Sequence, residues 1–491
     1  MTNAPAVDIC ATDLDAIPAF AGRIIVFVPE DGKLDKAARR VNKLCNGALD
    51  RFVQSEAFGK MDDGDASDLG WPAGLDAVAV QVVRLGTDPE PETARNAGAS
   101  IGAARGKHDL LVLGGTRKRL SDVLQGLLLR SYAFKECRTG EAAEPAGGSV
   151  TVMATGHKAL GAEMVAVNAV VDGVYLTRDL VNLPANYLTT KSFALKLVEL
   201  EELGITVEVL GEKDLRKLGM TMLLGVGQGS ESPSKVVVMQ WNGGGEEAPL
   251  ALIGKGVVFD TGGISLKPGA GMEDMTMDMG GAGVVSGVMK TLALRKAKAN
   301  VVGIVGLVEN MPDGKAQRPG DIVTSMKGDT VEVINTDAEG RLVLGDVMWY
   351  AQDRFNPCGM IDLATLTGAI IVALGHDNAG VFSNDDAFAD AFLAAAKTEG
   401  EGAWRMPIGP GYASLLKSPK ADMRNVGTRA GGSITAAEFL HNFVKDNTPW
   451  IHLDIAGVAQ PAKPPAWAPK GASGWGVMAL DRMIRDGYEG A

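Results

Sequence analysis

Strand-like and helix-like segments alternate along most of the chain, and this alternation constrains the fold more than any other feature. In the first third, apolar runs such as 22–29, 75–85 and 108–115 predict buried strands. Amphipathic patterns between them, at 33–45 and 92–105, predict helices. Strands that alternate with helices are typical of a mainly parallel sheet covered by helices. The sequence therefore predicts an α/β fold.

The length of the chain predicts more than one domain, because 491 residues exceed one ordinary hydrophobic core. A long apolar-periodic segment that begins at His157 predicts a single helix, ended by Pro184. We predict a non-catalytic N-terminal α/β domain at 1–156, with an oligomeric or regulatory role, and a linker helix at 157–183. A larger catalytic α/β domain, a mixed sheet flanked by helices, would follow at 184–491.

Charge and hydropathy limit the partners that we expect. The net charge of −12 offers no general attraction for nucleic acid or anionic membrane, and we interpret the basic run Arg117–Arg119 as a solvated helix face. The N-terminus lacks the pattern of a signal peptide, and no run of about 18 uninterrupted apolar residues predicts a membrane span. We expect a soluble cytoplasmic protein without membrane or nucleic-acid partners.

Three other patterns have simple structural interpretations. The four cysteines lack C-x-x-C spacing, so we expect small core residues and no disulfide framework. The glycines of Gly225–Ser230 precede a predicted strand rather than a helix, unlike a nucleotide-binding loop. His452 is expected to be a buried structural histidine, and the absence of H-E-x-x-H excludes a thermolysin-like zinc site.

The predicted strand at 249–260 carries two charges among its apolar residues. Lys255 lies within it and Asp260 ends it. A charge in a buried strand is unfavourable unless it is paired or bound to a metal. Ligands of open α/β sheets bind at the carboxyl ends of strands, where Asp260 falls. Alone, these residues could be a structural ion pair or part of a ligand site.

Asp278 stands just before a predicted helix, where it could cap the helix or bind a ligand. In the segment N-T-D-A-E-G-R, a predicted strand runs into a loop and then a helix. Alternate residues of an extended chain point the same way, so Asp337, Glu339 and Arg341 can share one face. Carboxylates that lie close together repel one another unless a cation lies between them.

Together with Asp260, these carboxylates predict a site for two divalent ions that activate water. Oxygen-rich ligation leaves Mn²⁺, Zn²⁺ and Mg²⁺ all possible.

The same segments resemble the leucyl (cytosol) aminopeptidase family. N-T-D-A-E-G-R-L matches the family signature, and G-K-G-V-V-F-D-T-G-G-I-S-L-K-P and M-x-x-M-x-x-D-M-G-G-A match two further blocks. D-L-A-T-L-T-G-A, residues 425–437 and H-L-D-I-A-G are also similar, so the resemblance covers roughly residues 157–491. Thr276 and Ser473 depart from the usual pattern, but neither is an expected ligand.

The resemblance implies a set of metal ligands. Asp260 and Glu339 would bridge two ions. The tighter-held ion would also take Lys255 and Asp278, and the readily exchanged ion would take Asp337. As a ligand, Lys255 would have to be neutral, so the dication would strongly depress its pKa.

The resemblance also implies the other roles in the site. Lys267 would polarise the scissile carbonyl, and Arg341 would hold a bicarbonate ion that acts as general base. The residues implied to line the substrate pocket are Met275, Asn335, Thr365, Leu366, Gly368 and Ala456. The family implies a homohexamer that releases N-terminal residues, mainly Leu and other apolar ones, from peptides.

Two alternatives remain open. Some bacterial relatives of this family have a DNA-binding or regulatory role, although the acidic net charge weighs against it here. A catalytically silent scaffold would require broken ligand positions, and none is broken in the matched segments.

Overall fold

The computed structural model describes residues 2–140 and 147–490. The chain divides into two compact units. The first unit contains Met1–Tyr175 and Pro464–Lys470, and the second contains Leu176–Lys463 and Gly471–Ala491. Both units are layered α/β structures, so the predicted fold class is confirmed.

The first unit is built on one six-stranded sheet. Its strands, in spatial order, are β1 (Val7–Cys10), β6 (Val150–Ala154), β5 (Leu110–Gly115), β2 (Arg23–Val28), β4 (Ala79–Arg84) and β3 (Ala66–Gly70). All neighbours pair in parallel except β3 with β4, as expected for a mainly parallel sheet. The two edge strands, β1 and β3, were not predicted, because they are short and largely not buried.

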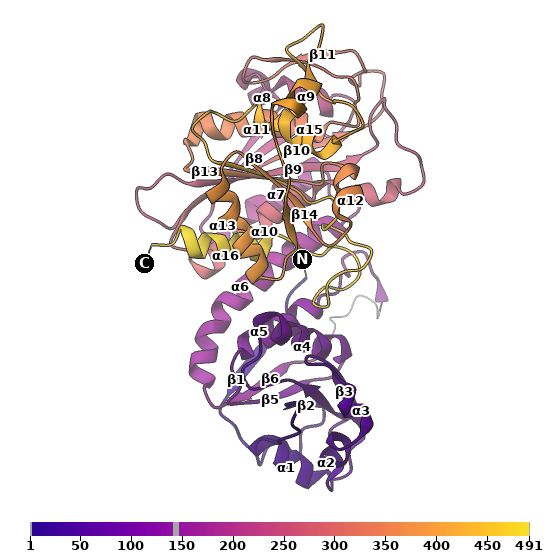
Figure 1. Ribbon diagram of the computed structural model, residues 1–491, viewed down its shortest axis with the longest axis vertical. Coiled ribbons are helices and arrows are strands. Elements are labelled where there is room, and N and C mark those ends of the chain that lie inside the picture. Colours follow the sequence, from indigo (N-terminus) through magenta and orange to yellow (C-terminus); the bar gives the residue numbers. More distant parts are fainter. Residues whose placement is uncertain (1, 141–146, 491) are drawn as a thin grey trace. The chain divides into compact units, whose positions relative to one another are not determined.

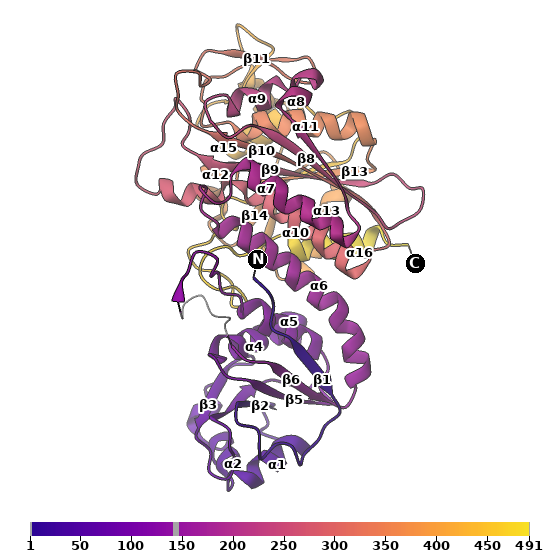
Figure 2. The same ribbon diagram turned by 180° about the vertical axis from the view of Figure 1, so that it is seen from behind.

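Helices cover both faces of this sheet (Figures 1 and 2). They are α1 (Lys36–Leu44), α2 (Ala48–Val53), α3 (Glu56–Gly59), α4 (Pro91–Ala104) and α5 (Leu120–Arg130). Helices α4 and α5 pack closely against each other on one face, while α1 and α2 lie on the other.

The helix predicted to begin at His157 is confirmed as α6 (His157–Asn182). By length and composition it could cross a bilayer, with a mean hydropathy of 1.4 over 18 residues, but half of that window is buried inside the protein. Its buried Arg178 donates a hydrogen bond from Nε to the Ser473 carbonyl at 2.9 Å. These features are typical of a core helix rather than of a membrane span.

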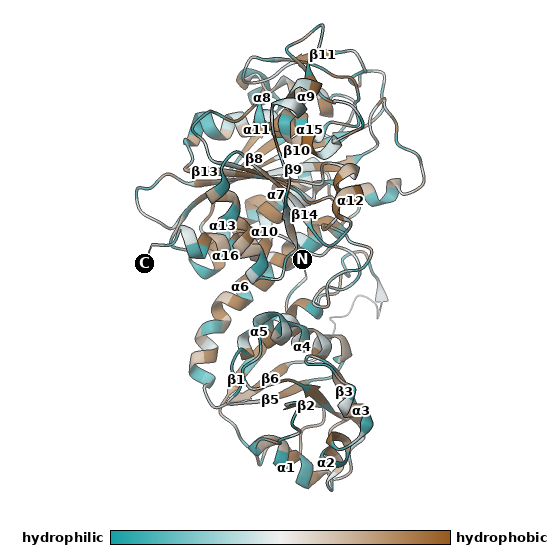
Figure 3. Ribbon diagram, viewed as in Figure 1, coloured by the Kyte–Doolittle hydropathy of each residue, from teal (hydrophilic) through white to brown (hydrophobic). Residues whose placement is uncertain are grey.

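The second unit is built on an eight-stranded mixed sheet, as predicted. In spatial order its strands are β15 (Ala403–Arg405), β14 (Ala379–Ser383), β17 (Trp450–Asp454), β13 (Gly359–Ala364), β9 (Leu250–Asp260), β10 (Asn300–Asn310), β8 (Lys235–Asn242) and β7 (Thr206–Gly211). The central strands β17, β13, β9 and β10 run parallel, whereas β14, β8 and β7 add antiparallel pairings. Strands β9 and β10 at the centre of the sheet are mostly apolar (Figure 3).

Helices lie on both faces of this sheet too (Figures 1 and 2). One layer contains α8 (Glu212–Leu218), α9 (Thr221–Gly227), α11 (Gly340–Phe355) and α15 (Gly432–His441). The other contains α7 (Thr190–Val198), η2 (Glu199–Leu203), α10 (Gly280–Arg295), α13 (Asp386–Thr398) and α16 (Val477–Gly487).

Short elements complete the second unit. They are η3 (Met272–Met279), α12 (Gly368–Leu374), α14 (Pro410–Ala413), η4 (Ser414–Leu416) and a small sheet of β11 (Ile322–Thr324), β12 (Thr330–Glu332) and β16 (Met423–Arg424).

All four cysteines are free thiols, but the expectation that they are core residues is only partly right. Cys45 is buried and Cys10 is partly buried, whereas Cys137 and Cys358 are exposed. A thiol is small enough to be tolerated at the surface, so its residue type alone does not decide its burial.

Asp346 fastens α11 to its surroundings. Its fully buried carboxylate accepts hydrogen bonds from the backbone N–H groups of Leu223, at 3.0 Å, and Met326, at 2.8 Å. Leu223 lies in the first turn of α9, where backbone N–H groups lack partners within the helix. The carboxylate therefore joins the two helices through groups that would otherwise be unsatisfied.

We expect Asp346→Ala to lower the free energy of unfolding by about 2–4 kcal/mol, because two buried N–H groups lose their acceptor. Urea unfolding monitored by fluorescence measures this loss. Asp353→Ala is the matched control on the same helix. Among the described residues Asp353 makes a surface ion pair with Lys445 alone, so we expect a loss below about 1 kcal/mol. Equal losses in the two variants would contradict the anchoring role.

Asp346 should also make stability depend on pH. Burial raises the pKa of its carboxyl to about 7, despite the backbone N–H groups that lower it. The native state therefore holds this proton more tightly than the unfolded chain, whose carboxyl titrates near about pH 4. The stability contributed by Asp346 should fall as the pH rises from about 4 to about 7. The variant Asp346→Asn lacks this titrating group, so its urea midpoint should rise relative to that of the unsubstituted protein as the pH increases from about 4 to about 7. If the midpoints of the two proteins changed with pH in parallel, Asp346 would not be the group responsible.

Candidate active site

The two charges of β9 are buried at the centre of the second unit. Lys255 is 2% exposed, and its Nζ lies 2.7 Å from Asp278 Oδ1 and 2.9 Å from Glu339 Oε1. It also donates a hydrogen bond to the Thr365 carbonyl at 2.9 Å. Lys255 therefore joins β9 to three segments that follow it in the chain. The simple alternative of a Lys255–Asp260 ion pair is wrong, because Asp260 makes its ion pair with Lys267.

The segment that follows β12 folds differently from the expectation. We expected an extended chain on which Asp337, Glu339 and Arg341 share one face. Instead, a turn closed by a hydrogen bond from the Ala338 N–H to the Asn335 carbonyl is followed at once by α11, with Glu339 at its N-cap in a helical conformation. A turn beside a helix start brings Asp337 and Glu339 together, but Arg341 points to a separate partner.

Three carboxylates converge where β9, this turn and α11 meet. Ligand oxygens of Asp260, Asp337 and Glu339 all lie within 4.8 Å of one another, the one such acidic group among residues 2–140 and 147–490. Lys267 donates hydrogen bonds to both Asp260 and Asp337. Asn310 donates to Asp260 Oδ1 at 2.7 Å, which fixes the orientation of that carboxylate.

Asp278 lies in η3, directly before α10. It does not cap α10, whose N-cap is Met279 without a side-chain hydrogen bond. Its Oδ1 accepts from Lys255 and, at 2.8 Å, from Thr365 Oγ1. Its neighbours Glu273 and Asp274 are exposed, so Asp278 is the acidic residue of η3 that faces the site.

The electrostatics of the site favour a cation. Burial and the nearby Glu339 raise the pKa of Asp260 to about 6, and burial raises the pKa of Asp278 well above its ordinary value. Asp278 Oδ2 and Glu339 Oε2 are buried and, within the described part of the chain, have no hydrogen-bond partner. Buried carboxylate oxygens without a donor are costly, and divalent cations satisfy such oxygens. The ligand set therefore fits the predicted metal ions.

The two lysines experience competing effects. Burial alone would lower the pKa of Lys255, but Asp278, Glu339 and Asp260 outweigh it and raise the pKa. The same balance, with Asp260 and Glu339 as the main partners, raises the pKa of Lys267. For Lys255 this direction is opposite to the depressed pKa that a ligand role implies. A neutral Lys255 would therefore require a dication that outweighs the carboxylates.

Two glycines make room for these side chains. A Cβ at Gly340 would lie 2.5 Å from Lys255 Cε and 2.8 Å from its Nζ. Gly262 has a φ of +85°, and a Cβ there would lie 2.8 Å from Asp337 Oδ1. A side chain at either position would displace a site residue.

Arg341 is buried, and Nη1 donates to the Asn425 carbonyl at 2.8 Å. Its Nε has no partner among the described residues. Burial lowers the pKa of Arg341 to about 10, against the opposing effect of Glu339 and Asp454, so the guanidinium remains charged at neutral pH. A buried cation with an unused donor can bind a small anion.

The predicted pocket residues fall into two groups. Thr365 and Leu366 follow β13, Gly368 begins α12 and is exposed, and Ala456 follows β17. The remaining two lie on other segments, with Met275 in η3 and Asn335 in the turn before α11.

Asp454 was not singled out from the sequence, although it lies within the recognised string H-L-D-I-A-G. Its buried carboxylate accepts hydrogen bonds from the Leu366 N–H at 3.1 Å, the Thr367 hydroxyl at 2.6 Å and the Ala456 N–H at 3.3 Å. It holds the loops after β13 and β17 together. The same strand carries His452, which is confirmed as a fully buried residue, with Nδ1 2.7 Å from Asp362 Oδ1.

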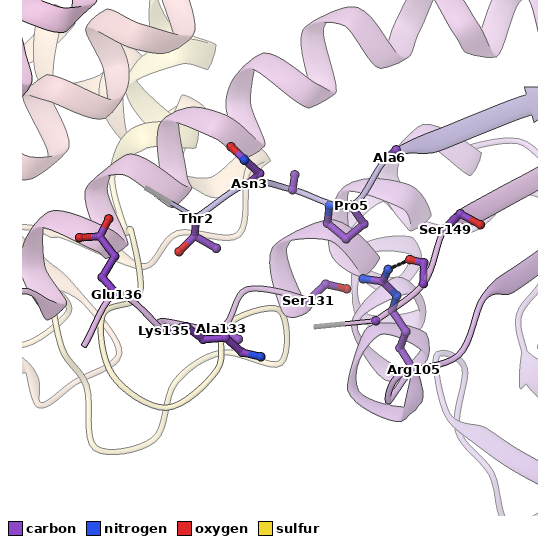
Figure 4. Close-up of a pocket in the computed structure, with 13 residues that line it drawn as sticks. Thr2, Asn3, Pro5, Ala6, Arg105, Ser131, Ala133, Lys135, Glu136 and Ser149 are labelled. Atoms are coloured by element: carbon purple, nitrogen blue, oxygen red, sulfur yellow. Dashed lines mark hydrogen bonds between the residues drawn. The ribbon is translucent and has the colours of Figure 1, made fainter. Parts of the chain in front are cut away.

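Two features of the first unit involve none of the predicted metal, catalytic or pocket residues. Within the basic run, Arg117 lies over the Phe27 ring and Lys118 pairs with Asp88 at 2.6 Å, so the run is not the purely solvated face that we expected. A cavity of about 580 Å³ lies beside Arg105, which donates to the Gly148 carbonyl (Figure 4). No predicted site residue lines this cavity.

Comparisons with known proteins agree with this site. Residues 175–480 match the catalytic domain of the cytosol aminopeptidase family. The probable cytosol aminopeptidases of Cereibacter sphaeroides and Dinoroseobacter shibae are 62% and 61% identical over 490 residues, covering 100% of each chain. A mutant of tomato leucine aminopeptidase has a TM-score of 0.86 at 30% identity, covering 98% of this chain and 97% of that one.

A second solved structure, the bottromycin maturation enzyme BotP in complex with Mn, has a TM-score of 0.82 at 32% identity and covers 95% of this chain and 99% of that one. The resemblance seen in the sequence is thereby confirmed. This chain belongs to the cytosol aminopeptidase family and is a peptidase.

Proposed function

We propose that this protein is a metal-dependent aminopeptidase that releases N-terminal residues, mainly Leu and other apolar ones, from peptides. The observation that carries the proposal is the convergence of Asp260, Asp337 and Glu339 oxygens within 4.8 Å of one another. Beside them lie the buried Asp278 Oδ2 and Glu339 Oε2, which have no hydrogen-bond partner among residues 2–140 and 147–490. Carboxylates in this number and proximity suit a pair of divalent ions.

Two divalent ions would be held by Lys255, Asp260, Asp278, Asp337 and Glu339, the ligand set that the family resemblance implies. Mn²⁺, Zn²⁺ and Mg²⁺ all suit this ligand set, and the Mn-bound relative supports the first. Two bound divalent ions supply Lewis acidity for the peptide carbonyl and lower the pKa of a water molecule.

Lys267 would stabilise the negative charge that develops on the carbonyl oxygen during attack. Its partly exposed side chain forms ion pairs with Asp260 and Asp337, and its raised pKa keeps it cationic. Arg341 would hold the bicarbonate ion that serves as general base, through its Nε, to which none of the described residues bonds. The two side chains would thus have separate roles. Lys267 would act on the substrate carbonyl, and Arg341 would hold the base that accepts the proton.

The substrate pocket would be formed by the loops that Asp454 joins, together with Met275 and Asn335. Met275, Leu366 and Ala456 offer apolar surface, which supports a preference for apolar side chains. We further propose a cytoplasmic location, which the names of the relatives, probable cytosol aminopeptidases, support. We also propose a homohexamer, which rests on the family resemblance alone. Nothing in the comparisons favours a DNA-binding role, and we do not propose one.

We expect Asp278→Asn to lower kcat/KM for a leucine anilide at least about a hundredfold, because a metal ligand loses its charge. Asp274→Asn is the matched control, since Asp274 is the exposed aspartate of the same η3 segment. Its activity should remain within about twofold of the unsubstituted protein. Similar losses in both variants, or none in either, would exclude Asp278 from the machinery.

Metal removal gives two readouts, and one of them, the melting temperature, does not depend on turnover. The metal-free protein should be inactive, and added Mn²⁺ or Zn²⁺ should restore hydrolysis and raise the melting temperature. At a free metal concentration of 100 times Kd, binding stabilises the native state by about 2.7 kcal/mol. Differential scanning calorimetry measures the shift. An unchanged melting temperature together with undiminished activity in a chelator would refute a metal-dependent reaction.

A further inference from the structure

We propose that Asn425 is a positioning residue that holds the turn at Asn335–Ala338, and thereby sets the spacing of the metal-binding carboxylates. The inference rests on the proposed metal site. Asn425 lies outside every segment to which we assigned a metal or catalytic role, and it is fully buried.

The side chain of Asn425 forms hydrogen bonds with backbone groups on both sides of Asp337. Its Oδ1 accepts hydrogen bonds from the N–H groups of Ile334, at 2.8 Å, and Asn335, at 3.4 Å. Its Nδ2 donates to the carbonyl oxygens of Asn335, at 2.6 Å, and Ala338, at 3.3 Å. A primary amide offers two donor hydrogens and one doubly accepting oxygen, so these four contacts use its full capacity.

Asn335 and Ala338, which Asn425 contacts, are each linked in turn to one of the proposed metal ligands. The Asn335 Oδ1 accepts a hydrogen bond from the Asp337 N–H at 2.9 Å, so a fixed Asn335 fixes Asp337. Ala338 is joined directly to Glu339. The amide of Asn425 thus restrains the residues that flank both carboxylates without contacting either.

The backbone of Asn425 adds two restraints. It follows β16, which pairs in parallel with β12, and its N–H donates to the Glu332 carbonyl at 3.1 Å. Its carbonyl accepts from Arg341 Nη1. One residue therefore holds the turn, the end of β12 and the proposed anion-binding arginine in a common frame.

Only an amide can satisfy all four groups of the turn. In Asn425→Asp, a carboxylate oxygen would face the carbonyls of Asn335 and Ala338, to which Nδ2 now donates. The carboxylate oxygen and the two carbonyl oxygens would repel one another, so the turn at Asn335–Ala338 would have to move. Residues that orient metal ligands typically change metal affinity by about 10–100-fold when substituted.

The test is calorimetric titration of Mn²⁺ into the metal-free full-length protein. Asn425→Asp should raise the Kd for Mn²⁺ by about 10–100-fold, and excess Mn²⁺ should recover part of the lost activity. Asn425→Ser removes the amide without adding charge and should weaken binding at least about tenfold. It serves as the second variant where Asn425→Asp does not fold.

Gln352→Glu is the matched control. Gln352 is also a buried amide with three hydrogen bonds to backbone groups, of Met348, Phe443 and Lys445, but it lies near the far end of α11. The substitution Gln352→Glu should lower the melting temperature but leave the Kd for Mn²⁺ within about twofold of the value for the unsubstituted protein.

The outcomes separate the two proposals. Weaker binding in the Asn425 variants alone supports the inference. Equal affinity in the unsubstituted protein and both Asn425 variants overturns it and leaves the proposed function standing. Equal weakening in Gln352→Glu also overturns it, because general destabilisation would then explain the loss. A protein without measurable affinity for Mn²⁺, Zn²⁺ or Mg²⁺ overturns the metal site itself.

Discussion

Mutual repulsion among buried carboxylates is the constraint on which the rest of the catalytic unit depends. Asp260, Asp278 and Glu339 are each at most 5% exposed, and Asp337 lies beside them. Two lysines partly compensate this charge, one from within β9 and one from the loop that follows it. The compensation is incomplete, since the pKa of Asp260 is still raised to about 6 and two carboxylate oxygens have no partner in the described chain. An arrangement of this kind is stable only where the surrounding structure forces it and a cation completes it.

The surrounding helices and buried amide side chains hold these carboxylates close together. Glycine at Gly340 lets the first turn of α11 approach Lys255, and Asp346 anchors the same helix to α9. Asn310 holds Asp260, and Asn425 holds the turn that carries Asp337. Amides suit this task because they donate and accept together without adding charge. The site is therefore a charged cluster within a neutral hydrogen-bonding frame, and its geometry does not depend on the charges alone.

Much of this could be predicted from local patterns. The apolar run of β9 with Lys255 and Asp260, and the string that contains Asp337 and Glu339, are continuous in the chain. Their residue types therefore identify a charged, metal-suited site and, through the family resemblance, its reaction class. Other features could not be predicted. Asn425 begins a segment that resembles the family, but nothing in that segment indicates which groups its side chain contacts. The loop between strand and helix was predicted, but the shared face of Asp337, Glu339 and Arg341 assumed extended chain, whereas the loop is a turn at Asn335–Ala338. The short edge strands β1 and β3 lack a sufficient apolar pattern.

The amino-acid sequence by itself determined the α/β class, the long helix at His157–Asn182, the family and the identity of the charged residues, because periodicity and short motifs are local properties. The tertiary structure alone decided which charges meet. Lys255 pairs with Asp278 and Glu339 rather than with Asp260, five residues away, since strand pairing and helix packing bring distant segments together. It also decided that Asn425, 84 residues beyond Arg341, braces the turn. Pairing in space depends on the packing of the whole unit, which no local pattern encodes.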